Sequence, residues 1–372
     1  MKIAYLSTAT IPSRKANSVH IMKMCAAFAK NGHEVTLYAP SINNKSNINI
    51  FNYYGVDEIF CVKRVLYPSF VFGHYFYAFF VLINLFFSKV DLIFSRNLLC
   101  LTFASLLTKD KILEIHQPIP NTSRLQNHLF RILISLKYFK KLIVITKPLK
   151  SIFLSKYDIS ENKILVAPDG ADIPTYINKI PSTSLKKLQV GYVGHLYNGR
   201  GIELIIELSK TCNWADFFIV GGNDNDIKRV KALCKNIKNI NIVGFLSPSK
   251  AETFRLSMDV LLAPYQTKVG LENSKLTTEA WMSPLKIFEY MAATKSIICS
   301  DIPVLHEVLK HNENCLLCKP TDLNEWKKAL ESLNDNKLLR ERLSKQAYSD
   351  LINKYTWQIR ANYILKKSIK VL

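Results

Sequence analysis

Residues 188–222 read LQVGYVGHLYNGRGIELIIELSKTCNWADFFIVGG, and they are the most informative stretch for the architecture of the chain. The apolar run 188–194 predicts a strand, residues 201–210 have the spacing of a helix, and 216–222 predict a second strand. A helix between two buried strands is the crossover unit of a parallel sheet. The glycines of the first loop allow a ligand to approach the backbone closely.

The same alternation of strand and helix continues on both sides of this unit. A polar segment with one proline, residues 178–187, predicts a linker between two such series. We therefore predict an α/β chain of two doubly wound, Rossmann-like domains facing across a cleft, with ligands at the carboxyl ends of the strands. The predicted domains are residues 1–180 and 186–355, with a C-terminal helix, 356–372, that packs back on the first domain. The other predicted strands are 2–8, 34–40, 91–97, 111–116, 141–147, 163–172, 239–245, 259–265 and 296–301.

Composition and charge narrow the class of partner. The chain has 372 residues, enough for two domains, and 48% of them are hydrophobic, as in globular proteins. Lysine and arginine number 50 and acidic residues 29, so the net charge is 50 − 29 = +21. Residues 1–186 hold 23 basic and 10 acidic residues, or +13, and the remainder holds 27 and 19, or +8. Such an excess indicates an anionic partner, but no nucleic-acid motif accompanies it, so a phosphorylated molecule or an anionic membrane surface is favoured over nucleic acid.

The cysteines and the first residues predict a cytoplasmic protein. Only Cys315 and Cys318, of eight cysteines, have C-x-x-C spacing, and the second ligand pair of a zinc site is missing. Most of the other cysteines lie in apolar runs and are expected to be buried thiols of a reducing compartment. The first apolar stretch is too short for a signal peptide and is expected to form a strand.

An uncharged segment, residues 65–88, contains ten aromatic residues. Its length would suffice to span a bilayer. Pro68, Gly73, His74 and Asn84 argue against a span. A span would also separate strands that belong to one sheet. Two alternatives stay open, a buried helix and a helix that lays its aromatic face into a membrane interface.

The strongest local signal for a binding site is MSPLKIFEYMAA, residues 282–293. Ser283 suits a helix N-cap and Pro284 the first helical position. The amides that follow lack intrahelical partners and carry the positive end of the helix dipole, so they favour an anion. These amides belong to Leu285, Lys286 and Ile287, and the lysine side chain strengthens the site for a diphosphate. The alternative is an ordinary capped helix with a surface lysine.

Three other residues are candidates for binding. Glu289 lies one turn after Lys286 on a neighbouring face of the helix, where its carboxylate can accept hydrogen bonds from ribose hydroxyls. Arg200 can neutralise a phosphate at the entry to its helix. His116 ends a predicted strand, although a single histidine is more often structural. The D-x-D pattern of residues 224–226 is interpreted as a turn and N-cap, so we expect no metal ion and no cofactor.

With these motifs the chain resembles the retaining glycosyltransferases of family 4, which have the two-domain GT-B fold. The resemblance covers almost the whole chain and is most specific over SPLKIFEYMAATKSIICSDIPVLHEVL, residues 283–309. This SPLK-type variant is similar to enzymes of capsule, exopolysaccharide and lipopolysaccharide assembly. Other matching stretches are GHEVTLYAP (32–40), FSRN (94–97), EIH (114–116), APDGAD (167–172), IVGG (219–222), NIVGF (241–245) and DVLLAPY (259–265).

The resemblance implies roles for particular residues. Arg200 and Lys286 would hold the donor diphosphate together with the helix amides, and Glu289 would bind the ribose. His116 would contact the donor sugar near the reaction centre. A loop at residues 16–18 would close over the donor phosphate and the acceptor. The implied donor-binding set also contains Gly194, His195, Gly244, Phe245, Ser283, Pro284, Leu285 and Ile287, and the implied acceptor side contains Asn17, Ser18, His20 and Arg96.

The sequence departs from the family pattern at three places. Trp281 stands where the first glutamate of the Glu-x7-Glu motif is expected, so sugar recognition must come from elsewhere. His195 replaces an arginine that usually follows the first glycine of the second domain, which leaves Arg200 a larger share of the phosphate. Asn17 and Ser18 replace a pair of glycines, which leaves the contacts of that loop open.

The implied activity is a retaining, metal-independent hexosyl transfer from a nucleotide sugar to a lipid-linked or polysaccharide acceptor. It would take place in cell-surface polysaccharide biosynthesis, in the cytoplasm at the inner face of the cytoplasmic membrane. Retention would follow from front-face attack, with the departing phosphate assisting deprotonation of the acceptor. Two alternatives remain: a sugar-nucleotide epimerase of the same architecture, and a non-catalytic partner subunit.

Overall fold

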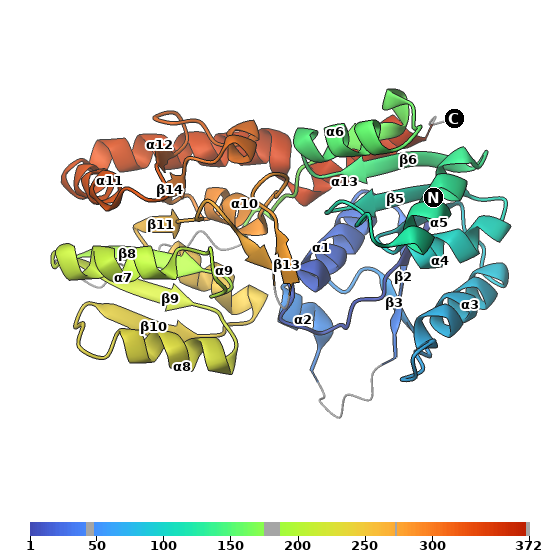
Figure 1. Cartoon of the computed structure of the whole chain (residues 1–372), viewed down its shortest axis with the longest axis horizontal. Helices are drawn as coiled ribbons and strands as arrows, with labels where there is room; N and C mark the ends of the chain where they lie inside the picture. The colour runs from blue at the N-terminus through green and yellow to red at the C-terminus, as the bar shows by residue number, and fades with distance from the viewer. Residues whose placement is uncertain (42–47, 175–186, 272–273, 370–372) are drawn as a thin grey trace. The chain divides into compact units, whose positions relative to one another are not determined.

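The computed structural model describes residues 1–41, 48–174, 187–271 and 274–369 (Figure 1). The chain divides into two compact units, one of Met1–Asp169 with Trp357–Leu372 and one of Gly170–Thr356. The predicted linker, 178–187, lies outside the described residues except for its last residue. Each unit is an α/β domain with a parallel sheet, so the predicted pair of doubly wound domains is confirmed.

The first unit has a sheet of seven parallel strands in the order β3-β2-β1-β4-β5-β6-β7. The two strands at its centre, β1 and β4, are short apolar runs that are buried almost throughout, as expected for a sheet covered on both faces. The strands are β1 (Lys2–Leu6), β2 (Glu34–Pro40), β3 (Cys61–Val65), β4 (Leu92–Ser95), β5 (Asp110–Ile115), β6 (Phe139–Val144) and β7 (Ile164–Val166).

The helices of the first unit connect these strands, and one further helix returns from the C-terminal end of the chain. That helix, α13 (Trp357–Ser368), lies beside α1 (Ala16–Lys30), where the side-chain Nδ2 of Asn31 donates to the Gln358 carbonyl at 3.0 Å. The other helices are α2 (Ile50–Tyr54), α3 (Gly73–Phe86), α4 (Leu98–Phe103), α5 (Arg124–Ser135) and α6 (Lys147–Lys156), with short 3-10 turns at Ala104–Leu106 and Glu161–Lys163.

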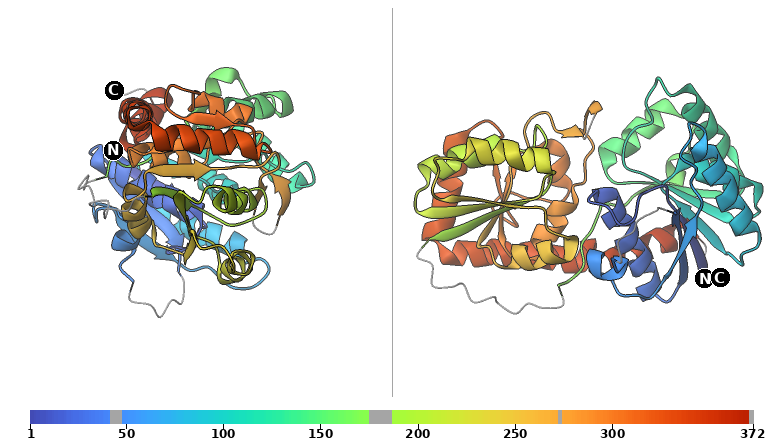
Figure 2. Two further views of the ribbon diagram at one scale, coloured as in Figure 1. Left: turned by 90° about the vertical axis from the view of Figure 1, so that its left-hand side faces the viewer. Right: turned by 90° about the horizontal axis from the view of Figure 1, so that it is seen from below.

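The second unit has a six-stranded parallel sheet in the order β10-β9-β8-β11-β14-β15, with helices on both faces (Figure 2). Its strands are β8 (Leu188–Val193), β9 (Ala215–Val220), β10 (Ile240–Gly244), β11 (Val260–Ala263), β14 (Ser296–Ser300) and β15 (Leu316–Cys318), beside a small hairpin of β12 (Gly270–Leu271) and β13 (Ser274–Thr277). Its helices are α7 (Ile202–Thr211), α8 (Asp224–Leu233), α9 (Pro248–Leu256), α10 (Leu285–Ala292), α11 (Leu323–Asp335) and α12 (Lys337–Asp350), with a 3-10 turn at Pro303–Glu307 and a π-turn at Leu351–Tyr355.

In both sheets the strand order reverses beside the first strand of the unit. The reversal lies between β1 and β4 in the first sheet and between β8 and β11 in the second. Ligands of open parallel sheets bind beyond the carboxyl ends of the strands at such a point. Arg96 follows β4, and Gly194 follows β8, so both stand where a ligand site is expected.

The aromatic segment forms α3, which is neither fully buried nor fully exposed. One side of the helix packs on the unit through Tyr77, Val81 and Leu85, and the Tyr77 hydroxyl donates to the Ser7 carbonyl at 2.5 Å. Phe76 and Phe79, on the opposite side, keep 46% and 47% of their surface exposed. Further exposed apolar side chains lie before the helix, at its last residue and just after it: Leu66, Phe70, Val71, Phe72, Phe86 and Phe87.

Within the described part of the chain, no helix has the length and apolar character needed to cross a bilayer.

The cysteines follow the expectation of buried thiols with one exception. Cys61, in β3, is exposed, because this strand lies at the edge of its sheet.

Candidate functional site

The side chain of Lys286 is a buried cation in the second unit. It lies in the first turn of α10 and is only 8% exposed. The Lys286 Nζ has no hydrogen-bond partner among the described residues. It lies 3.9 Å from the ring centre of Tyr192 and 5.0 Å from that of Tyr265, within the range of cation–π attraction.

The residues around this ammonium group leave space for it. A glycine is needed at position 194, because a Cβ there would lie only 2.8 Å from the Lys286 Nζ. Tyr192 is held in place by its hydroxyl, which donates to the His195 carbonyl at 2.5 Å. Burial lowers the pKa of Lys286 well below its usual value, and the charge of Arg200 lowers it further. An anion bound beside Lys286 would relieve both effects.

Arg200 provides a second cation close to the same tyrosine. Its guanidinium carbon lies 5.6 Å from the ring centre of Tyr265, and its Nη2 donates to the Gly270 carbonyl at 3.4 Å. Its Nε is buried and has no hydrogen-bond partner in the part of the chain that the structure describes. Gly201 makes the turn into α7 with φ of 76°, and a Cβ there would lie 1.8 Å from the Pro264 carbonyl oxygen. Arg200 and Lys286, the two cations predicted from the sequence, thus both lie near the ring of Tyr265.

The start of α10 differs from the prediction by one residue. Pro284, with an extended ψ of 124°, is the N-cap and makes no side-chain cap, and the helix begins at Leu285. Ser283 therefore is not the predicted N-cap, since it lies one position too early. The Ile287 amide donates to the Pro284 carbonyl at 3.0 Å, so it is not one of the open amides that were predicted.

Glu289 has an ion-pair partner that the sequence did not suggest. Arg255, which is buried on α9, places its Nη1 3.2 Å from the Glu289 Oε2. The glutamate side chain is half-buried. The ion pair holds one oxygen of the Glu289 carboxylate against Arg255 and so restricts the orientation of the carboxylate. The sequence offers no local signal for this pair, because the two residues lie on different helices, α9 and α10.

The remaining predicted donor-side residues lie in loops after the strands. His195 stacks on Tyr197, with ring centres 4.7 Å apart. Gly244 ends β10 with φ of 88°, and Phe245, like Trp281, is half-buried. The D-x-D residues form the first turn of α8, whose N-cap is Asn223; Asp226 completes a capping box with it, so the predicted N-cap is displaced by one residue.

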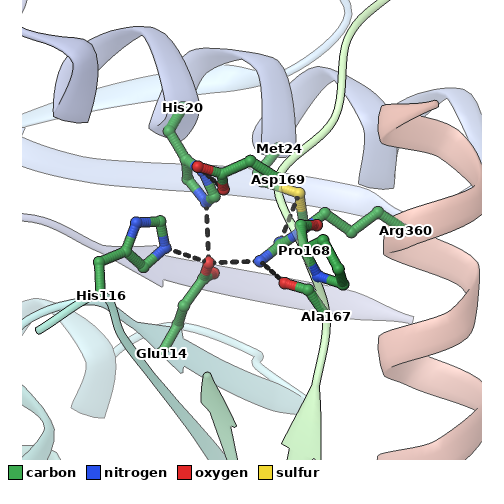
Figure 3. A network of polar contacts seen from close by, with 8 residues as sticks. All are labelled: His20, Met24, Glu114, His116, Ala167, Pro168, Asp169 and Arg360. Carbon is green, nitrogen blue, oxygen red and sulfur yellow. Dashed lines mark hydrogen bonds and ion pairs between the residues drawn. The ribbon is translucent and has the colours of Figure 1, made fainter. Parts of the chain in front are cut away.

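Five polar residues of the first unit form a second cluster, in which Glu114 is the centre (Figure 3). The Glu114 Oε1 lies 2.6 Å from the Arg360 Nη2, 2.7 Å from the His116 Nε2 and 3.0 Å from the His20 Nε2. The Nδ1 of His20 lies 3.0 Å from the Asp169 Oδ1. The cluster therefore joins β5, α1, α13 and the segment after β7.

Burial and charge act against each other in this cluster. Burial alone would raise the pKa of Glu114, but the charge of Arg360, with the contacts from His20 and His116, holds it well below its usual value. Burial likewise acts to raise the pKa of Asp169, and the two histidines and Arg360 lower it. For His116, burial and the charge of Arg96 lower the pKa to about 4.

The cluster also contains the residue types of a metal site. Ligand atoms of His20, Glu114, His116 and Asp169 lie within 4.8 Å of one another. Arg360 already supplies a positive charge to the oxygen at their centre, at 2.6 Å. A metal ion there would have to displace this guanidinium, so the donor set fits an internal ion pair better than a metal.

The predicted acceptor-side residues differ in how far they are exposed. Residues 16–18, expected as a loop, are the first turn of α1, because Ser18 bonds the Lys15 carbonyl at 2.8 Å and draws the chain into the helix. Ser18 and His20 are buried and contact other residues of the unit, whereas Asn17 is exposed. Arg96 is half-buried, and its Nη1 has no hydrogen-bond partner within the described ranges.

Comparison with known proteins shows which families the two units resemble. Residues 18–174 match the model of Glycosyltransferase Family 4, and residues 176–350 match the model of Glycosyl transferases group 1. Among solved structures, that of Anabaena Alr3699/HepE in complex with UDP superposes with a TM-score of 0.73 at 12% identity, over 98% of this chain and 99% of that one. The two units thus have the GT-B fold.

Two curated relatives are similar in sequence. An uncharacterized glycosyltransferase of Methanocaldococcus jannaschii, MJ1069, is 25% identical over 62% of this chain and 57% of its own length. The O-antigen chain mannosyltransferase RfbU of Salmonella typhimurium is 23% identical over 64% of this chain and 65% of its own length. The chain therefore matches somewhat more than half the length of each of these relatives.

The depressed pKa of His116 predicts how stability depends on pH. In the unfolded chain this histidine binds a proton below about pH 6.5, but in the folded protein only near pH 4. The unfolded state then binds more protons between these values, so the free energy of unfolding falls as the pH falls from 6.5 to 4. We expect His116→Gln to reduce this slope by about 1.4 kcal/mol per pH unit near its middle.

Urea unfolding measured at several pH values between 4 and 7 checks this expectation. The matched control is His128→Gln, which changes an exposed histidine on α5 and is expected to leave the slope as in the unaltered protein. Equal slopes in all three proteins would contradict the depressed pKa.

Proposed function

Because its two units have the GT-B fold and match two glycosyltransferase family models, we propose that this chain is a glycosyltransferase that uses a nucleotide-sugar donor. The acceptor in this proposal is a lipid-linked or polysaccharide glycan of the cell surface. Similarity to an O-antigen chain mannosyltransferase supports that class of acceptor. The structure of Alr3699/HepE in complex with UDP supports a nucleotide as part of the donor.

The observation that carries the proposal is the buried cation site of the second unit. Lys286 and Arg200 have buried donor atoms without hydrogen-bond partners among the described residues, and both approach Tyr265. Two neighbouring cations, each with a buried donor atom that no described residue satisfies, favour a ligand with two negative charges close together. A diphosphate has this property, and the amino end of α10 adds its dipole.

The proposal gives each remaining residue a task. Glu289, oriented by Arg255, accepts hydrogen bonds from the ribose hydroxyls. Gly244 and Phe245 flank the nucleobase, and His116 contacts the donor sugar. The acceptor-side role proposed for Asn17 and Arg96 rests on the family resemblance alone.

The chemistry that follows is a substitution at the anomeric carbon. The bond between this carbon and the phosphate oxygen breaks, and the acceptor hydroxyl oxygen forms a new bond to the carbon. The acceptor oxygen attacks from the same face that the phosphate leaves, so the anomeric configuration is retained. The proton of the hydroxyl goes to the departing phosphate. Arg200 and Lys286 stabilise the negative charge that develops on the diphosphate, and this electrostatic task needs no metal ion.

Removing one cation should weaken nucleotide binding strongly. We expect Lys286→Met and Arg200→Met each to raise the Kd about 10- to 100-fold, since a hydrogen bond to a charged group contributes about 1.5–3 kcal/mol. Thermal stabilisation by UDP, GDP, ADP and CDP identifies the best probe, and calorimetry with it gives the Kd. The control is Lys235→Met, at an exposed lysine after α8. Unchanged Kd values in both site variants would rule out the proposed site.

The products should separate transfer from its two alternatives. We expect the sugar nucleotide to be consumed only with an acceptor glycan present, and the new linkage to keep the anomeric configuration of the donor in NMR spectra of the product. An epimerase would convert the sugar nucleotide without acceptor. Donor binding with no transfer to any acceptor pool would instead indicate a non-catalytic subunit, and an inverted linkage would exclude the retaining mechanism.

We also propose that the first unit binds the inner face of the cytoplasmic membrane through α3. Phe76 and Phe79 form an exposed aromatic side of this helix. The exposed cations Lys63 and Lys89 lie just before and after the segment. Residues 1–186 also carry a net charge of 23 − 10 = +13. Apolar side chains together with cations suit the interface of an anionic membrane.

The double variant Phe76→Ser/Phe79→Ser should bind membranes more weakly without unfolding, because both side chains are about half exposed. We expect sedimentation with phosphatidylglycerol-containing vesicles to fall several-fold, and to fall also with added salt. Vesicles of phosphatidylcholine alone should bind less protein. The control is Leu338→Ser, an exposed leucine of α12 in the other unit. A double variant that binds like the unaltered protein would exclude α3 as the contact.

A further inference from the structure

The C-terminal helix α13 reaches a predicted substrate-contacting histidine through one carboxylate. Arg360, which is 3% exposed, donates from its Nη2 to the Glu114 Oε1 at 2.6 Å, although the two residues lie 246 positions apart. The same oxygen faces the His116 Nε2 at 2.7 Å (Figure 3). Glu114 is fully buried, so this oxygen depends on protein donors rather than on water.

The arginine fixes the charge of this carboxylate. Arg360 also donates from its Nε to the Pro168 carbonyl at 2.8 Å and from its Nη2 to the Ala167 carbonyl at 3.0 Å, so its orientation is set by the backbone. A guanidinium does not release its proton in proteins, and therefore it favours the ionised form of Glu114 at every pH near neutrality. An ionised carboxylate only accepts hydrogen bonds.

The tautomer of His116 follows from that constraint. Since the Glu114 oxygen accepts, the His116 Nε2 at 2.7 Å must carry a proton. The charged groups whose fields reach this imidazole are Glu114, Asp169 and Arg96, and burial together with Arg96 favours the neutral ring. In a neutral imidazole with a protonated Nε2, the Nδ1 holds a lone pair and accepts hydrogen bonds.

His20 approaches the same carboxylate oxygen. Its Nε2 lies 3.0 Å from the Glu114 Oε1, and its Nδ1 lies 3.0 Å from the Asp169 Oδ1. Its ring meets that of His116 edge-on, with ring centres 4.7 Å apart, which restricts the rotation of His116. The imidazole of His116 is therefore held by a hydrogen bond on one edge and by a ring contact, while 19% of the side chain stays exposed.

We propose that Arg360 is a positioning residue that acts through Glu114 to hold His116 as the Nε2-protonated tautomer, with its Nδ1 offered as an acceptor to a substrate hydroxyl. This deepens the proposed function, since the hydroxyl belongs to a sugar only if the chain is a glycosyltransferase. The tautomer itself is a property of the first unit and is independent of that proposal. The substrate group that His116 recognises is thereby specified as a hydrogen-bond donor.

The unaltered protein provides the first test. Full-length chain labelled with 15N-histidine is recorded in long-range 1H–15N correlation spectra at pH 7, and the signals of His116 are identified by their loss in His116→Gln. The expected spectrum shows a protonated Nε2 and an unprotonated Nδ1. A protonated Nδ1, or an imidazolium, at pH 7 would overturn the proposal, whether or not the chain transfers sugars.

Two substitutions of the arginine then test its role. In Arg360→Met, burial can raise the pKa of Glu114, because the charge that opposed it is gone. We expect Glu114 and His116 then to share a proton, so that both tautomers of His116 are populated and the pair takes up this proton at a higher pH than His116 does in the unaltered protein. Arg360→Lys keeps the charge and should restore most of the original spectrum and titration. Identical tautomers and titrations in Arg360→Met and the unaltered protein would overturn the role of Arg360. If Arg360→Met does not fold, Arg360→Gln, which removes the charge but keeps a hydrogen-bond donor, is recorded in its place, with the same expected and overturning outcomes.

Activity gives a readout that fold stability alone would not move. We expect Arg360→Met to lower kcat for sugar transfer and to shift the acidic limb of its pH profile upward, with nucleotide Kd unchanged because that site lies in the other unit. A uniform fall in kcat with the pH profile unaltered would assign Arg360 a structural role. Absence of transfer in every protein, with the expected spectra, would defeat the proposed function and leave the tautomer assignment intact.

Discussion

The first unit depends on one buried ion pair, between Glu114 in β5 and Arg360 in α13. Both groups are removed from water, so each would be costly without the other, and losing one partner of such a pair costs about 3–5 kcal/mol. The arginine also satisfies two carbonyls of the segment that leaves the sheet after β7. The side chain of Arg360 thus connects the C-terminal helix to the sheet and to the segment after β7. His116 and His20 are oriented in turn by the same Glu114 oxygen.

In the second unit the buried charge is the ammonium group of Lys286, and it is accommodated differently. Among the residues that the structure describes, the ammonium group of Lys286 faces tyrosine rings rather than a carboxylate. A fixed acidic partner would have neutralised it and weakened its attraction for any anion that arrives. Aromatic faces stabilise the ammonium less than a carboxylate would, so much of its electrostatic potential stays available to a ligand. The glutamate nearby, Glu289, is occupied by Arg255 instead.

The two parallel sheets could be predicted because buried parallel strands have a recognisable sequence pattern, in which short apolar runs alternate with segments of helical spacing. The sequence also predicted Lys286 and Arg200 as a pair. Each stands at the start of a helix, where an anion is favoured, and the family resemblance assigns both to the donor diphosphate. Pairs such as Glu114 with Arg360, or Glu289 with Arg255, could not be predicted, because nothing local distinguishes which of many charges will meet. The two sides of α3 were hidden for another reason. Its residues are apolar all round, so periodicity cannot reveal which of them face outward.

Because α13 belongs to the first unit while residues 170–356 form the second, the second unit is an insertion within the first. Synthesis on the ribosome runs through the insertion before it reaches Arg360. The second unit can therefore complete its sheet while the first still lacks a helix and holds Glu114 without its guanidinium. The order of translation makes the first unit, although it begins the chain, the last to be finished.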